Sequence, residues 1–328
     1  MIIEWTNRKD GSTTDITQLI TSVSWGGSTS QAARTAEVAV TNAPDDKNIV
    51  QLTIATGDVI QLYENSNLVF YGEVQTREKT SETGMVTYNC NDLLIHLLKS
   101  TAVYNFADTT AEDITKKVCA DFSIEMGTIA ETKATIKKMI VDGSTIYDII
   151  MLAYTKAARQ TGEKYICRMD GTKLLVEIKG TQIENFVLAE EYNITNTSYQ
   201  ETIENMANVI KIYDDTGKQI GEIKNDEWVK QYGVYQQTYK KEKGVNETLA
   251  AENLLNGIEM NVTLEGINGD LKCVAGNGVE VYDKSTGLSG LFWIDSDTHV
   301  WENGTHTMSL ELNFKNIMDS KEDSNQET

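Results

Sequence analysis

Apolar and polar residues alternate along two distant stretches of the chain, and the two stretches match each other. Gly57–Tyr63 and Gly276–Tyr282 both begin with glycine and alternate up to a tyrosine, at an offset of 219 residues. A period of two predicts half-buried strands. Each stretch is followed by an aromatic-rich strand (68–74 or 291–295) and then by an alternating strand (85–90 or 307–314). The pattern therefore predicts a small β-domain that occurs twice.

The match could also be accidental, because short strands bounded by glycine resemble one another by chance. The duplication is favoured because three successive strands match in order. One feature weakens it: an apolar helix at 92–99 follows the first hairpin, whereas the helix after the expected cap Asn246 precedes the second hairpin. We expect the first sheet to curl over the 92–99 helix and bury it.

Further strands are predicted near the N-terminus. The segments 2–6, 23–25 and 33–41 alternate, Gly26-Gly27 is expected to break the pattern, and a turn with the only proline follows at 42–46. After residue 190 the alternation returns at 209–213, 220–223 and 234–239. These segments belong to the two predicted β-domains.

Between residues 100 and 190 the apolar spacing changes to that of helices. Thr110 begins a capping-box variant before an apolar stripe that ends at Phe122, and Ser144 is expected to cap a second helix. A strand at 134–141 lies between them, and a hairpin turns at Asp170-Gly171. The fold class is α+β, with a first β-domain (1–99), an α/β module (100–190), a second β-domain (191–318) and a disordered acidic tail (319–328).

Composition and charge narrow the possible functions. Of 328 residues, 40% are hydrophobic and 24% charged, and no apolar run is long enough for a membrane helix, which predicts an ordinary globular protein without membrane insertion. The net charge of −20 disfavours specific nucleic-acid binding, because binding to phosphates needs cationic groups. It permits an acidic pore through which DNA passes without adhering.

The residues that could carry chemistry are few. The four cysteines (Cys90, Cys119, Cys167 and Cys273) are expected to be buried free thiols, and His96 a core or rim histidine. Asp295, Asp297 and His299 alternate and could bind a divalent metal, but they also read as a hydrated strand end, which we favour. No nucleophile, zinc or nucleotide motif occurs. The sequence therefore predicts no catalytic residue, no metal and no cofactor.

Several stretches together resemble a known family. The chain resembles the XkdQ-type tail proteins of phages and defective phages of Gram-positive bacteria and, more distantly, the baseplate hub of T-even phages. The resemblance spans nearly the whole chain and rests on Trp25–Gly27, Arg34–Val40, Gly57–Tyr63, Asn91–Ser100, Ile203–Val209 and Ser296–Trp301.

The resemblance implies a structural hub at the end of a contractile tail. Such a hub is a homotrimer in which each chain carries two β-barrel domains similar to tail-tube subunits. Six domains would then meet the hexameric tail tube protein, while the threefold face meets the central spike protein; other baseplate and tape-measure proteins are further partners. We expect the protein in the virion tail baseplate, assembled in the cytoplasm of the bacterial host.

Two other functions stay open at this point, as does the choice between a phage and a phage-tail-like bacteriocin. Residues 100–190 could be a cell-wall (peptidoglycan) hydrolase, or the chain could be a carbohydrate-binding β-protein. Trp228, Tyr232 and Tyr235 lie outside the clearest alternation and are the predicted protein-interface residues, although they could equally be core.

Overall fold

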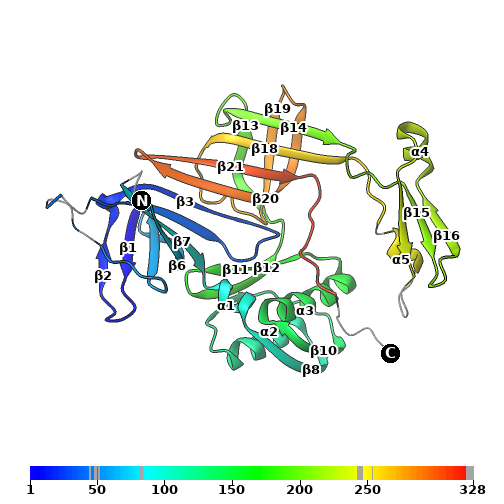
Figure 1. The fold of residues 1–328 in the computed structure, drawn as a ribbon, viewed down its shortest axis with the longest axis horizontal. Helices are drawn as coiled ribbons and strands as arrows, with labels where there is room; N and C mark the ends of the chain where they lie inside the picture. Colours follow the sequence, from blue (N-terminus) through cyan, green and yellow to red (C-terminus); the bar gives the residue numbers. More distant parts are fainter. Residues whose placement is uncertain are drawn as a thin grey trace. The chain divides into compact units, whose positions relative to one another are not determined.

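The computed structural model describes residues 1–43, 46–47, 50, 52–80, 84–241, 247–252 and 254–322 (Figure 1). The chain divides into two compact units. The first contains Met1–Thr197 and the described residues from Thr263 onward, and the second is Ser198–Val262. No helix in the described part of the chain is long and apolar enough to cross a membrane.

Most strands belong to one large sheet, and among its strand pairs with a described register only β13 with β19 is parallel. Its order is β14-β18-β21-β20-β3-β4-β7-β6-β5-β1-β2, and β13 and β19 extend it beside β20. The bounds are β1 Ile2–Thr6, β2 Thr13–Asp15, β3 Ile20–Ser28, β4 Thr35–Thr41, β5 Val59–Glu64, β6 Asn67–Lys79, β7 Met85–Asp92, β13 Gln182–Ala189, β14 Asn196–Thr202, β18 Glu259–Asn268, β19 Gly278–Asp283, β20 Leu288–Glu302 and β21 Thr305–Asn313. A short 3-10 helix, η1 (Thr17–Leu19), precedes β3.

The expectation of two β-barrels is corrected here, because no pairing among the described strands closes the sheet. The reason is the length of β20. Its first half pairs with β19, and its second half pairs with β21 on one edge and with β3 on the other. The two predicted copies are thereby joined into one continuous sheet.

The internal repeat is visible in the hydrogen bonds. The nitrogen of Gly57 donates to the oxygen of Val74, and the nitrogen of Val74 donates to the oxygen of Asp58 (2.8 and 2.9 Å). Gly276, Ile294 and Asn277 make the same two bonds in the second copy, also at 2.8 and 2.9 Å. Both initial glycines have a positive φ, +87° and +96°, which explains why glycine opens both copies.

The strands that follow these bonds are equivalent as well. In the first copy β5, β6 and β7 pair in succession, and in the second β19, β20 and β21 do so. The register of β6 with β7 shifts between Val74 and Thr76, and that of β20 with β21 shifts between Ile294 and Ser296. A bulge at the same place in both copies is strong evidence for a true repeat, because bulges are specific features of a sheet.

The predicted α/β module contributes most of one hydrophobic core, to which Ala33, Leu94, Leu97 and Met318 also belong. It contains β8 Thr101–Thr109, α2 Ala111–Asp121, β9 Met126–Ile129, β10 Ile136–Thr145, α3 Ile146–Thr161, β11 Tyr165–Asp170 and β12 Lys173–Ile178. The inner side of α3 supplies much of the core, including the fully buried Ile149, Ile150 and Ala153. The last strand of the predicted range, β13, leaves this core and pairs with β19.

The helix at 92–99 is present as α1 (Leu94–Lys99), but it packs elsewhere than expected. Leu94 and Leu97 belong to the core of the α/β module, not to that of the first β-sheet. The sequence could show that the helix is apolar nearly all round, but not which neighbour would cover it. The expectation of one helix inside each β-domain is therefore wrong for the first copy.

The helix starts are close to those predicted. Thr110 caps α2, and its side chain accepts a hydrogen bond from the nitrogen of Asp113. The cap of α3 is Thr145 and not Ser144, because the Thr145 hydroxyl accepts from the nitrogen of Asp148 at 3.0 Å. The expected cap Asn246 and Pro44 of the predicted turn at 42–46 lie outside the described residues.

The second unit contains a small sheet of order β16-β15-β17. Its elements are β15 Val209–Tyr213, β16 Gln219–Lys224, α4 Asp226–Tyr232, β17 Gln236–Lys240 and α5 Glu247–Glu252. Its core cluster is made by Ala207, Ile210, Ile212 and Ala251, all from the same unit. This unit falls inside the predicted second domain, and the boundaries proposed at 99/100 and 190/191 remain predictions.

Two local expectations are wrong. The strand β3 continues through Gly26 and Gly27, because the partner strand comes so close that a Cβ on Gly26 would lie 2.4 Å from the oxygen of Asp297. Residues 319–322 are ordered on α3: Tyr147 donates to Asp319 at 2.8 Å, and the nitrogen of Lys321 donates to Thr155 at 3.0 Å. The rest of the predicted disordered tail, 323–328, lies outside the described residues.

Candidate functional site

The junction of β3 with β20 is the place where the two copies meet. Seven residue pairs form its antiparallel ladder, from Ser28 opposite Ser296 to Ser22 opposite Glu302. Residues from the start and the end of the chain are thereby held side by side (Figure 1). The geometry of this junction decides how one copy is placed against the other.

A buried ion pair crosses the junction. The Arg34 guanidinium donates to both carboxylate oxygens of Asp297, with Nη1–Oδ1 at 2.9 Å and Nη2–Oδ2 at 2.5 Å. The Asp297 side chain is completely buried and that of Arg34 is 13% exposed. Asp297 also accepts a hydrogen bond from the nitrogen of Ala275 at 2.6 Å. A fork-to-fork pair of this kind fixes orientation as well as distance.

Two histidines extend the buried cluster. His299 lies 3.0 Å from His306 through Nδ1 and Nε2, and its own Nε2 lies 3.1 Å from the oxygen of Cys273. Burial lowers the pKa of His299 from 6.5 to about 4, and the Asp297 carboxylate opposes this shift only in part. His299 is therefore a neutral, hydrogen-bonded core histidine at physiological pH.

Aromatic rings cover the charges. The Arg34 guanidinium carbon lies 4.1 Å from the centre of the Trp25 ring, and the Trp301 ring stacks on His306 at 4.0 Å. Cation–π contact and stacking keep water from the ion pair, which strengthens it. These interactions position strands, and none of them presents a reactive group to solvent.

The three residues weighed as metal ligands are not all brought together. Asp297 and His299 are 3.5 Å apart, but Asp295 lies at the bulge and bonds to Asn313 at 2.8 Å and Thr29 at 3.4 Å. Among the described residues no three His, Cys, Asp or Glu side chains form a group that could hold a metal. The favoured hydrated strand end is also wrong, because Asp297 and His299 are buried.

The other residues weighed for chemistry have structural contacts. All four cysteines are free and buried, as expected. His96 is a rim histidine whose Nε2 lies 3.0 Å from Glu73. Asp92 is buried, which raises its pKa to about 7, and its carboxylate accepts from the nitrogens of Arg34 and Leu94.

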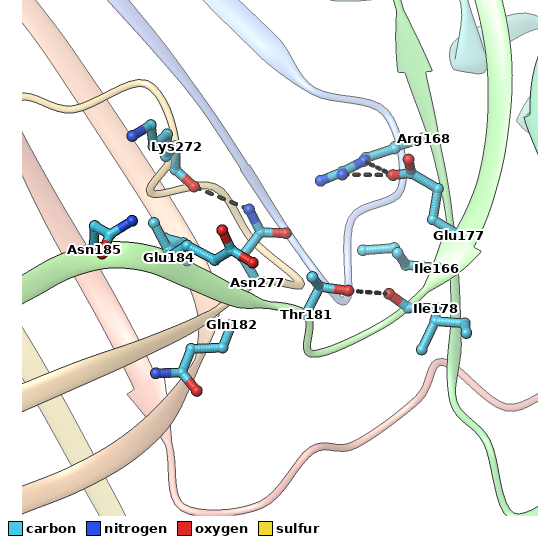
Figure 2. A pocket seen from close by; sticks show the side chains of 11 residues that line it. Ile166, Arg168, Glu177, Ile178, Thr181, Gln182, Glu184, Asn185, Lys272 and Asn277 are labelled. Atoms are coloured by element: carbon cyan, nitrogen blue, oxygen red, sulfur yellow. Dashed lines mark hydrogen bonds and ion pairs between the residues drawn. The ribbon is translucent and has the colours of Figure 1, made fainter.

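A groove of the first unit lies between the hairpin β11–β12 and the start of β13 (Figure 2). Its volume is about 510 Å³. The charged pair in its wall is Arg168 with Glu177, and Asn277 donates to the oxygen of Lys272 at 2.9 Å. Thr181 lies in the turn between β12 and β13, and its hydroxyl donates to the oxygen of Ile178.

This groove does not favour the hydrolase alternative. Its lining contains neither histidine nor cysteine among the described residues, and Glu177 is already held by the Arg168 guanidinium. Its threonine donates to a backbone carbonyl, and its other carboxylate, Glu184, is exposed to solvent. A nucleophile needs an adjacent base, and paired carboxylates need distinct environments.

The predicted interface residues all lie in the second unit. Trp228 and Tyr232 are half-buried on α4, and Tyr235 is exposed just before β17. A Cβ on Gly257 would lie 2.6 Å from the Trp228 ring, so this tryptophan covers a glycine of its own unit. The nitrogen of Tyr235 donates to the Asn208 side chain at 2.8 Å. Their role as contact residues remains a prediction.

Sequence reasoning missed Arg34 as the partner of Asp297. The signal that could have found it is the presence of both residues in the characteristic stretches Arg34–Val40 and Ser296–Trp301. Nothing in either stretch shows that they meet, because 263 positions separate the two side chains.

Comparison with known proteins gives consistent matches. The family model described as YQBQ-like matches residues 23–313. The phage-like element PBSX protein XkdQ of Bacillus subtilis (strain 168) is 26% identical over 310 residues, which cover 90% of this chain and 93% of that protein.

Two solved structures share the fold. The 43 kDa tail protein of prophage MuSo2 from Shewanella oneidensis has a TM-score of 0.72 at 12% identity, over 95% of both chains. The E. coli c3393 protein, described as a type VI secretion component with structural similarity to the T4 tail proteins gp27 and gp5, has a TM-score of 0.51. Its identity is 6%, over 89% of this chain and 73% of that one.

Proposed function

Because this chain belongs to the YQBQ-like family, which its match over residues 23–313 shows, we propose that it is the structural hub of a contractile phage tail or phage-tail-like particle. It is similar to a phage-like element protein and shares the fold of a prophage tail protein, and these similarities support a structural role in a phage tail. In the hub, three chains would form a ring between the sixfold tail tube and the threefold central spike.

The internal repeat is the observation that carries the proposal. Two equivalent strand sets, β5–β6–β7 and β19–β20–β21, lie in one sheet and are fixed to each other by the β3–β20 ladder. Three chains with two copies each present six related surfaces on a threefold ring. A closed ring needs an interface that repeats with the rotation, and the repeat supplies it.

The proposed ring implies its partners. A tail tube protein hexamer would meet the six copies, and a central spike protein would meet the threefold face, with other baseplate and tape-measure proteins nearby. The net charge of −20 would favour passage of DNA without adhesion if acidic side chains line the bore. The protein would be located in the tail of the virion.

Native mass measured by light scattering over a concentration series tests the ring. We expect a trimer at the higher concentrations, and a trimer on mixing with tube protein if the free chain is dilute. A mass that stays at one chain under both conditions would contradict the hub. Dimers without trimers would contradict the threefold ring.

A further inference from the structure

One strand edge is paired with a neighbouring strand in the second copy, whereas the corresponding edge in the first copy has no described partner strand. In β20 the residues Ser296–Glu302 pair with β21 on one side and with β3 on the other. In β6 the equivalent residues pair with β7, and no described strand pairs with their other edge. The side chains of residues 75–79 on this edge are exposed. An unpaired edge of this kind is a template for another strand.

The shared hydrogen bonds fix which residues correspond. Val74 and Ile294 make the same two bonds, and each precedes a bulge, so Thr76 corresponds to Ser296 and Arg77 to Asp297. The partner strand keeps the correspondence: Tyr88 lies opposite Arg77, and Leu310 lies opposite Asp297.

The strand β14 is the second copy's counterpart of β3. β3 pairs with β4, which pairs with β7, while β14 neighbours β18, which neighbours β21. A hydrogen bond at the strand ends supports this match. The nitrogen of Asn42 donates to the oxygen of Gly84, and the nitrogen of Gly269 donates to that of His306.

Side-chain contacts set the residue correspondence of β14 with β3. Thr195 donates to the oxygen of Gly266 at 2.7 Å, and Asn196 donates to the Glu265 side chain at 3.1 Å, which places these residues opposite each other. With that register, Thr197 and Tyr199, the less exposed side chains, take the places of the buried Val23 and Trp25. Continuing along the strands, Glu201 corresponds to Gly27 and Thr202 to Ser28.

We propose that the open edge of β6 pairs with β14 of a second copy of this chain, antiparallel, with Thr76 opposite Thr202 and Arg77 opposite Glu201. This register repeats the internal ladder, in which Ser296 lies opposite Ser28 and Asp297 opposite Gly27. The partner is a second copy because six strands separate β14 from β6 within one sheet. The inference rests on the proposed ring and names its contact.

Charge supports this register. The internal junction joins Arg34 to Asp297, and the contact between chains would join Arg77 to Glu201, directly opposite each other in the ladder. Opposite charges facing across antiparallel strands stabilise the pair, whereas like charges destabilise it. Because each chain carries a net charge of −20, two chains repel one another, and a local attraction of this kind specifies where they meet.

One feature differs between the two ladders. Gly26 allows the close approach of β3 to β20, and Gln200 stands at the corresponding position of β14. A side chain there requires ordinary strand spacing, about 4.8 Å between neighbouring strands. The contact between chains is therefore looser than the internal one, as a contact that forms during assembly requires.

Engineered disulfides test the register. In the variant with Thr76→Cys and Thr202→Cys, two copper(II) ions each accept one electron as the two thiols lose their protons and form a sulfur–sulfur bond. We expect covalent dimers and trimers on a non-reducing gel. The native cysteines are all buried, so their background is low. The matched control joins Thr76→Cys with Ser198→Cys, which is off register by four residues, about 13 Å, and should not cross-link.

Exchange of the facing charges gives a second, non-covalent measurement. Arg77→Glu places a glutamate opposite Glu201, and we expect the concentration needed for half-trimer formation to rise at least about tenfold. Adding Glu201→Arg to the same chain should restore it. The control Lys137→Glu makes the same charge change at an exposed pair with Asp108 and should leave assembly unchanged.

The outcomes separate this inference from the ring itself. Trimers that form without the disulfide between positions 76 and 202, or without rescue by the double charge exchange, would overturn the β6–β14 contact and leave the hub intact. Cross-linked ladders that continue beyond three chains would support the contact and contradict the closed ring. Absence of both cross-link and assembly at every concentration would overturn both.

Discussion

At the scale of single residues, Arg34 and Asp297 matter most for the stability of the β3–β20 junction. Asp297 is completely buried. Among the described residues, the Arg34 guanidinium is its only cationic partner within ion-pair distance, because His299, at 3.5 Å, is neutral. Removing one member of a buried pair leaves an uncompensated charge, which costs more than the pair contributes. The ion pair therefore ties the residue just before β4 to β20, across β3.

We expect Arg34→Ala to lower the free energy of unfolding by about 3–5 kcal/mol. Chemical denaturation followed by circular dichroism measures it. Lys137→Ala removes an exposed ion pair and should cost at most about 1 kcal/mol. Equal losses in the two variants would contradict a special role for the buried pair.

His299 makes stability depend on pH. In the unfolded chain this histidine takes up a proton near pH 6.5, but in the folded chain only near pH 4. The unfolded state therefore binds more protons between these values, so the stability contributed by neutral His299 is present above pH 6.5 and is lost as the pH falls toward 4. The full effect is on the order of 3 kcal/mol.

The variant His299→Gln isolates this contribution. A variant is needed because Asp92 changes the stability of the wild type with pH in the opposite direction. Its pKa is raised to about 7, so the folded state holds a proton that the unfolded state releases near pH 3.8. We expect the difference in unfolding free energy between wild type and variant to shrink as the pH falls from 6.5 to 4. A difference that stays constant with pH would show that His299 is not buried neutral.

At the scale of elements, the close approach of β3 to β20 depends on glycine. A Cβ on Gly26 would lie 2.4 Å from the oxygen of Asp297, which is backbone and cannot turn away. We expect Gly26→Ala to separate the strands and cost about 1–3 kcal/mol. Faster amide hydrogen exchange at His299 and Trp301, whose backbone groups face β3, would locate the damage in this ladder.

Gly221→Ala in β16 is the matched control. Its Cβ would lie 3.2 Å from the end of the Ile212 side chain, which can rotate away. Its stability should stay near or slightly above that of wild type, because alanine has less freedom to lose on folding. If both alanine variants behave alike, the tightness of the β3–β20 junction is not what the glycine provides.

At the scale of the whole molecule, the described residues of the second unit form a core cluster of their own. Its core cluster contains Ala207, Ile210, Ile212 and Ala251 only from residues 198–262. The ends of the inserted segment, Thr202 and Glu259, lie on the neighbouring strands β14 and β18. The sheet therefore does not need this segment for its own packing.

We expect that replacing residues 203–258 with a short Gly–Ser linker changes the unfolding free energy of the first unit by less than about 1 kcal/mol. Hydrogen exchange in β20 and β4 reports on that unit. As a control, Ile210→Ala removes a fully buried side chain and should cost about 2–5 kcal/mol inside the second unit alone. Lost protection in β20 in either variant would show that the cores are coupled.

The sequence by itself determined the local elements and the repeat. Alternation at Gly57–Tyr63 and Gly276–Tyr282 depends on residues two apart, and the cap at Thr110 depends on residues three apart. Both features can therefore be predicted from short segments of the sequence. The start of α3 was missed by one residue, because Ser144 and Thr145 are both good caps and only the backbone distinguishes them.

Only the tertiary structure decided how these elements meet. The pairing of β3 with β20, the packing of α1 into the α/β module and the ion pair between Arg34 and Asp297 join residues far apart in sequence. Alternation shows that a strand has a buried face, but not which strand lies at its edge, because edges bond through the backbone that all residues share. For that reason the repeat was predicted from sequence, while its merging into one open sheet was not.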